Sequence, residues 1–264
     1  MVRPGALTVF DLDTLQSVGT IAGVNAGGAT VDPKTHHGFS TTKPVTMWDA
    51  NTLAVLKSID VDGRPDGILF DPYNERVWIL SHTPPYATVI DAKEGAVVGT
   101  VDLGGAPEQA VSDGKGTIFV NIADKASIAV VDAKHMSVRT HFDVSSKGSR
   151  GSGLAYDAKH HVLFAYYRQP SATAVIVDAR NGNIITTLPT GIGVDTVAFN
   201  PATMEAISAE TAGSMTFIKE NSPTNFAIEQ TLQTIPGAKT IALDPKTNRL
   251  FTMTAEFEPK HYFI

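Results

Sequence analysis

The chain of 264 residues contains no cysteine. Disulfide bonds, a thiolate nucleophile and a zinc site built on cysteine are therefore excluded. Long apolar runs are also missing: they reach only about five to eight residues before Asp, Pro or Gly interrupts them, well short of a membrane span. The N-terminus, Met1-Val2-Arg3-Pro4-Gly5, shows no apolar stretch or cleavage site of a signal peptide. We expect a soluble chain.

Charge is sparse as well, with 18% charged residues and a formal net charge of −6. Such a chain has no basic surface of the kind that neutralises phosphates, so a nucleic-acid partner is not expected. Hydrophobic residues make up 42% of the sequence, which is ample for a buried core. We expect one globular domain over 1–264.

The first positive feature is an internal repeat of about 40 residues. One unit of it is an alternating strand, which closes on Asp in every copy but the sixth. These strands lie at 7–11, 45–49, 88–91, 128–132, 174–178 and 215–219. A turn and a second, β-branched strand follow, for example at 15–21, 96–101 and 184–188.

Each repeat also contains two further strands. The first ends in Asp-Pro or a variant, a turn signal because proline fixes φ and cannot donate to a continuing ladder. These endings are 31–33, 70–72, 112–114, 156–158, 199–201 and 243–245. A short strand follows every time, at 38–40, 77–80, 118–120, 163–165, 206–208 and 250–252. Four strands in about 40 residues, without an amphipathic helix, predict an all-β propeller of about six blades.

The repeat resembles that of the YVTN-repeat propellers, the YncE-like family. Its best copies are Arg64-Pro65-Asp66-Gly67-Ile68-Leu69-Phe70-Asp71-Pro72 and 106–113, and Ile118-Phe119-Val120-Asn121 stands for the namesake strand. The resemblance covers nearly the whole chain. It implies that the Asp-Pro strand comes first in each blade, and it implies a periplasmic or secreted protein.

Two blade counts remain open. The chain starts at the third strand of one blade and ends after the second strand of another, so its ends could pair and close a six-bladed ring. Family members have seven blades with a composite terminal blade, so the chain could instead be a seven-bladed parent that lacks this blade. The tail at 258–264 could begin a further strand.

Equivalent loop positions of a propeller converge around its channel and form rings. Five residues before the Asp or Asn that ends each first strand lie Gly27, Asp66, Glu108, Ser152, Asp195 and Lys239, and all of these except Gly27 are candidate ligand-binding residues. The three carboxylates, Asp66, Glu108 and Asp195, are candidate ligands of a calcium ion, which prefers several oxygen atoms. They could also contact a cationic partner, or simply line a water-filled mouth.

A second ring follows the ends of the short strands. It contributes the candidate ligand-binding residues Asn121, Tyr167, Arg168 and Glu210. Tyr166-Tyr167-Arg168 combines aromatic faces with a guanidinium, which suits stacking on a ring-shaped ligand. Alternation sends the two tyrosines to opposite sides, so one of them is expected to pack in the core. His82 is a candidate base or metal ligand, or an ordinary loop histidine.

Two other motifs are interpreted as structural. The doublets His36-His37 and His160-His161 fall in the turn after the Asp-Pro strand, and neighbouring residues of an extended chain point apart, which argues against a shared metal. The glycine-rich segment 148–153 leads into a strand, whereas phosphate-binding loops lead into a helix.

No catalytic motif is present, and no cofactor is identified beyond the possible calcium ion. The leading hypothesis is a binding or interaction scaffold for an unknown protein, peptide or small molecule, which rests mainly on the fold. The alternative is a calcium-assisted hydrolase of the lactonase-like propeller type, with Asp66, Glu108, Asn121 and Asp195 as ligands and His82 as base. A redox-cofactor scaffold and single-stranded DNA binding rank lower, because haem motifs are absent and the predicted mouth is acidic.

Overall fold

The computed structural model describes residues 2–3, 5–24 and 27–254. Regular structure in these residues consists of 25 strands, and no helix occurs among them. The helix-free, all-β prediction is confirmed for this part of the chain. The tail at 258–264, which could begin a further strand, lies outside the described residues.

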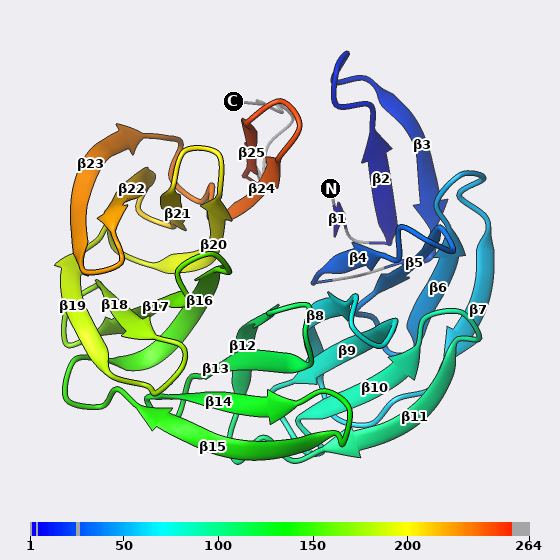
Figure 1. Ribbon diagram of the computed structural model, residues 1–264. Coiled ribbons are helices and arrows are strands. Elements are labelled where there is room, and N and C mark those ends of the chain that lie inside the picture. Colours follow the sequence, from blue (N-terminus) through cyan, green and yellow to red (C-terminus); the bar gives the residue numbers. More distant parts are fainter. Residues whose placement is uncertain (1, 4, 25–26, 255–264) are drawn as a thin grey trace. The chain divides into compact units, whose positions relative to one another are not determined.

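The strands form five complete four-stranded sheets, each paired in chain order (Figure 1). The first contains β4 (Ala29–Val31), β5 (His37–Ser40), β6 (Val45–Asp49) and β7 (Val55–Ile59). The second contains β8 (Pro65–Asp71), β9 (Arg76–Ser81), β10 (Ala87–Asp91) and β11 (Ala96–Val101). The third contains β12 (Pro107–Ser112), β13 (Thr117–Ile122), β14 (Ser127–Asp132) and β15 (Ser137–Asp143).

The fourth and fifth sheets follow the same plan. The fourth contains β16 (Ser149–Asp157), β17 (Val162–Gln169), β18 (Thr173–Asp178) and β19 (Ile184–Pro189). The fifth contains β20 (Val194–Asn200), β21 (Glu205–Glu210), β22 (Ser214–Ser222) and β23 (Asn225–Gln233). The predicted propeller blades of four antiparallel strands are thus confirmed.

Two incomplete sheets come from the ends of the chain. β2 (Ala6–Phe10) and β3 (Ser17–Ala22) form the expected third and fourth strands of a blade, and the short β1 (Val2–Arg3) pairs with β2. β24 (Thr240–Asp244) and β25 (Arg249–Met253) form the expected first and second strands. About six blades are therefore confirmed, and ring closure stays a prediction.

The recurring aspartates shape the turns between strands. Asp32, at the end of the first strand of its sheet, accepts hydrogen bonds from Lys34 N at 2.9 Å and from Thr35 Oγ1 at 2.7 Å. Asp49, at the end of the third strand, accepts them from the backbone of Asn51 and Thr52 at 2.9 and 2.7 Å. A side chain that satisfies the backbone of its own turn stabilises that turn, which explains the regular return of Asp.

Contacts group the chain into two compact units. The first comprises Met1–Glu108, Gly114–Ile118 and Val131–Arg139, and the second comprises Gln109–Asp113, Phe119–Val130 and Thr140–Ile264. The single domain over 1–264 stays a prediction.

Each unit has its own hydrophobic core between neighbouring sheets. In the first unit, Phe39, Met47 and Ile59 of the sheet β4–β7 pack with Val77 and Ile90 of the sheet β8–β11. In the second unit, the buried face of β16–β19 packs on that of β20–β23; the residues include Ala155, Phe164, Tyr166, Val197, Ile218 and Phe226. Sheet faces thus pack on sheet faces, as in propeller blades.

No described segment forms a helix of the length and hydropathy that a membrane span requires. This finding agrees with the short apolar runs of the sequence.

Candidate functional site

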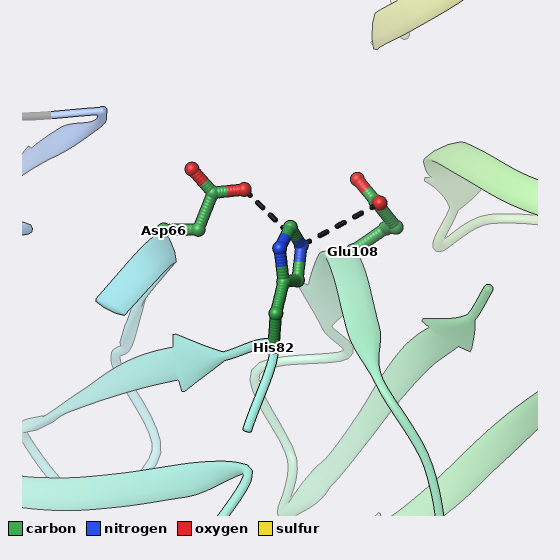
Figure 2. Close-up of side chains that lie close together, drawn as sticks. All are labelled: Asp66, His82 and Glu108. Carbon is green, nitrogen blue, oxygen red and sulfur yellow. Dashed lines mark ion pairs between the residues drawn. The ribbon is translucent and has the colours of Figure 1, made fainter. Parts of the chain in front are cut away.

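Three predicted side chains come together in the first unit. Asp66 lies near the start of β8, Glu108 near the start of β12, and His82 directly after β9. His82 Nε2 lies 3.2 Å from Asp66 Oδ2 and 3.5 Å from Glu108 Oε1. Figure 2 shows the imidazole between the two carboxylates, and we call these three residues the Asp66 cluster. The expected convergence of consecutive first strands is confirmed at this point.

Local backbone contacts bring these residues into range. A Cβ atom on Gly67 would lie 3.3 Å from the carbonyl oxygen of Glu108, so the glycine lets β8 and β12 approach closely. The backbone N–H of His82 donates to the carbonyl of Arg64 at 3.2 Å, and Arg64 N donates to Ser81 Oγ at 2.6 Å. These bonds fix the end of β9 against the segment that leads into β8.

The imidazole of His82 is held from one side. Arg64 Nη2 lies 3.3 Å from His82 Nδ1, and because a guanidinium only donates, Nδ1 accepts this bond. A neutral His82 therefore carries its proton on Nε2. This Nε2 atom is buried and makes no hydrogen bond, although both carboxylate oxygens lie near it.

The cluster is open to solvent on its acidic side. The side chain of Asp66 is 50% exposed, whereas those of His82 and Glu108 are each 23% exposed. One ligand atom from each residue lies within 4.8 Å of the others. A ligand can therefore reach the carboxylates while the imidazole stays fixed below them.

These donor atoms fit a transition-metal ion better than calcium. Two ligand atoms about 2.1 Å from a metal ion lie about 3.0 Å apart at an octahedral angle and about 3.4 Å apart at a tetrahedral one. The observed 3.2 and 3.5 Å are close to these spacings. Calcium prefers six to eight oxygen ligands, whereas an imidazole nitrogen suits zinc, iron or nickel.

The third predicted calcium ligand, Asp195, is already neutralised. It belongs to the second unit, where Arg168 Nη2 lies 3.0 Å from Oδ1 and Lys239 Nζ lies 3.1 Å from Oδ2. Two cations on one carboxylate leave it poorly suited to a metal ion. The three side chains remain partly exposed and form a mixed-charge group: Asp195 and Lys239 lie at the starts of consecutive first strands, and Arg168 lies near the end of β17.

Four predicted ligand-binding residues are buried, and this corrects the prediction. None of them is exposed, and each makes internal hydrogen bonds; they are Asn121, Ser152, Tyr167 and Glu210. A side chain without exposed surface cannot contact a ligand. The interpretation of Asn121 as a metal ligand fails for the same reason.

The partners of these residues explain their burial. Tyr167 donates its hydroxyl to Asn121 Oδ1 at 3.0 Å, and Glu210 accepts hydroxyl hydrogens from Ser208 at 2.6 Å and Ser214 at 2.7 Å. Buried polar groups need such partners. Burial raises the pKa of the Tyr167 hydroxyl far above its usual range, so it remains a hydrogen-bond donor.

Neither tyrosine of the predicted stacking motif is free to stack. Tyr166 and Tyr167 point to opposite faces of β17 as expected, but each face is covered by a different hydrophobic cluster. The second strand of this blade is buried on both sides. Alternation alone could not distinguish such a strand from one with an exposed face.

The motifs interpreted as structural follow that interpretation only in part. All but the first residue of the segment 148–153 belong to β16, and the left-handed residues His36 and His161, with φ of 61° and 60°, lie in turns. His160, however, contacts two carboxylates, Asp157 and Glu220, which the sequence interpretation missed. An alignment of the repeats could have indicated this contact, because His160 and Glu220 stand where other repeats carry threonine and alanine.

Comparisons with known proteins agree with the repeat. No protein-family model matches the chain. The uncharacterised protein YncE of Salmonella typhimurium is 23% identical over 259 residues, which cover 75% of this chain and 72% of that protein. YncE of Salmonella typhi is 24% identical, and the match covers 69% of this chain but only 53% of the relative.

Solved structures add the same fold at low identity. A chain of the mitotic checkpoint complex matches with a TM-score of 0.81 at 11% identity, covering 95% of this chain and 78% of that one. A chain of hydrazine synthase from Kuenenia stuttgartiensis matches with a TM-score of 0.82 at 14% identity, covering 95% and 86%. Together with the four-stranded sheets and the repeat, these likenesses show that the chain is a β-propeller that resembles YncE.

Proposed function

We propose that this propeller is a binding scaffold whose Asp66 cluster takes a divalent transition-metal ion. The observation that carries the proposal is His82 Nε2, a buried nitrogen without a hydrogen bond that faces two carboxylate oxygens at 3.2 and 3.5 Å. The partly exposed carboxylates leave positions for a further ligand from solution. A donor group of a protein, peptide or small molecule could occupy such a position on the metal ion.

Calorimetric titration of the chelator-treated chain with Zn²⁺ tests the site. The double variant Asp66→Asn, Glu108→Gln removes both carboxylates and is expected to abolish binding at this site. The matched control Asp13→Asn, Glu94→Gln makes the same change of charge at two exposed positions of the same unit and should bind as the wild type does. Equal binding by the two double variants would refute the proposal.

Arg64 supplies a second, independent test. A metal ion on Nε2 moves the imidazole proton to Nδ1, which can then no longer accept the bond from Arg64. Binding must break this contact, so Arg64→Ala should tighten Zn²⁺ binding by about twofold to tenfold, the equivalent of one ordinary hydrogen bond. Weaker binding by this variant would contradict the assignment of Nε2 as the ligand atom.

Metal-assisted hydrolysis is a second candidate function, because the cluster offers three protein ligands and is open to solvent. A bound metal ion would supply Lewis acidity there and lower the pKa of a bound water molecule. Turnover of simple lactones and esters should then depend on added metal and disappear in Asp66→Asn, Glu108→Gln. Metal binding without turnover would leave the binding scaffold as the function.

The resemblance to YncE-like propellers also supports a periplasmic or secreted location. Cell fractionation of the native protein tests this, and recovery with the cytoplasmic fraction would contradict it.

A further inference from the structure

A second group of possible ligands lies buried in the second unit. It consists of Asp157 at the end of β16, His160 in the following turn, and Glu220 in β22 of the next sheet. His160 Nδ1 lies 2.9 Å from Asp157 Oδ2 and 2.7 Å from Glu220 Oε1. The side chains of Asp157 and Glu220 are only 2% and 0% exposed, and that of His160 is 24% exposed. We call this group the Asp157 cluster.

Glu220 departs from the residue that the other blades carry. Its backbone N–H donates to the carbonyl of Met204, in the turn between the first and second strands of its own sheet. The residues that make the corresponding bond in the four preceding complete sheets are all alanine, namely Ala50, Ala92, Ala133 and Ala179. A position that a methyl group fills elsewhere thus holds a buried carboxylate. Such a replacement destabilises a fold unless the charge is compensated.

His160 is a departure of the same kind. It stands three residues after the aspartate of its turn, where Thr35 and Thr247 donate their hydroxyls to Asp32 and Asp244 at 2.7 and 2.6 Å. A histidine at this position reaches further than threonine and meets Glu220 of the next sheet. Two departures from the repeat therefore face each other at 2.7 Å.

The charges of the cluster call for a dication. When both buried carboxylates are ionised they carry two negative charges, of which a protonated His160 would balance only one. Glu220 Oε2 is buried and has no hydrogen-bond partner, so part of the carboxylate is unsatisfied. A divalent ion beside a neutral imidazole balances both charges and satisfies this oxygen.

The spacing of the donors also fits a metal ion. The separations of 2.7 and 2.9 Å are close to the roughly 3.0 Å between neighbouring ligands of an octahedral ion. With both oxygens of Glu220, the group offers four donor atoms, one of them nitrogen. This mixed set suits zinc, manganese or iron rather than calcium.

We propose that Asp157, His160 and Glu220 form a buried site for a divalent transition-metal ion that links the sheet β16–β19 to the sheet β20–β23. The ion has a structural role, because it holds two neighbouring blades together at a place where an uncharged contact can serve instead. For example, Asn74 Nδ2 donates to the carbonyl of Ala133 at 2.8 Å at the corresponding place in the first unit.

The test compares the thermal unfolding of the full chain in EDTA and in Zn²⁺. At a hundredfold excess over Kd, binding to the folded state alone should raise Tm by about 5–10 °C. The variants Glu220→Ala and His160→Thr install the residues that other blades carry, so both are expected to fold. Each should lose the part of the Zn²⁺-dependent rise in Tm that comes from this site, and each should bind one zinc ion per chain fewer than the wild type, counted by elemental analysis after gel filtration.

The variant Asp66→Asn, Glu108→Gln is the control, because it should keep the rise in Tm. This control separates the two sites. If the Asp66 cluster binds no metal ion, Glu220→Ala should still lower the Zn²⁺-dependent rise in Tm. The proposal is overturned if the wild type gains no stability from Zn²⁺, which would mean that protons alone hold the cluster. It is also overturned if Glu220→Ala gains as much stability from Zn²⁺ as the wild type.

Discussion

Gln109 in β12 is expected to stabilise the second unit through one partly buried amide. Its Nε2 donates to the carbonyl of Val197 at 2.9 Å, and its Oε1 accepts from Leu154 N at 3.2 Å and from Val197 N at 3.1 Å. The pairing register of β16 shifts just before Leu154, and that of β20 shifts just before Val197. Irregularities of this kind free backbone groups from the ladder, and the Gln109 amide satisfies them.

Replacement of this side chain by alanine removes all three hydrogen bonds. A net contribution of about 0.5–1.5 kcal/mol for each bond gives a loss of about 1.5–4.5 kcal/mol. Leu154 and Val197 are 0% and 4% exposed, so water cannot easily replace the lost partner. The loss should therefore lie in the upper half of this range.

Urea denaturation of Gln109→Ala measures this loss, and Gln230→Ala in the exposed β23 is the matched control. The control should change the free energy of unfolding by less than about 0.5 kcal/mol. Gln109→Met keeps most of the volume and should lose nearly as much stability as Gln109→Ala, since the bonds rather than the packing matter. Equal stability of Gln109→Ala and Gln230→Ala would refute the reasoning.

Two further predictions concern protonation. A backbone N–H and the Arg139 guanidinium lower the pKa of Asp132 below its usual 3.8, so the stability it contributes is lost only as the pH falls below that value. In Arg139→Gln the pKa should rise but stay below 3.8, as the backbone bond, the larger cause, remains; an unchanged NMR titration would contradict this. Burial raises the pKa of Tyr156 to about 12 and those of Tyr166 and Tyr167 well above 10.0, so these three of the 6 tyrosines should stay protonated near pH 10 in an absorbance titration. Ionisation of all six there would contradict the observed burial.

The sequence alone determined the blade and its strands. Turn chemistry and alternation are local properties, so Asp32 and Asp49 mark their turns without knowledge of the rest of the chain. The repeat also predicted that equivalent residues of consecutive blades become neighbours. The pairs Asp66 with Glu108, through His82, and Asp195 with Lys239 agree with this expectation.

Only the tertiary structure decided which of the candidate residues are accessible. Tyr167, Glu210, Arg168 and His82 all lie at or just after the end of the second strand of a blade. Tyr167 and Glu210 are nevertheless buried and hydrogen-bonded inside the second unit. Burial depends on how closely the next sheet packs on a strand, and neither spacing nor alternation within one strand contains this information.

The contacts between blades were decided at the same level. Gln109 reaches Val197, 88 positions further along the chain, and His160 reaches Glu220, 60 positions further. Within a single repeat none of these side chains indicates its partner, and His160 and Glu220 stand out only when the repeats are compared. Their chemistry arises from the side chain that the neighbouring blade places opposite, because a propeller brings corresponding positions of separate repeats into contact.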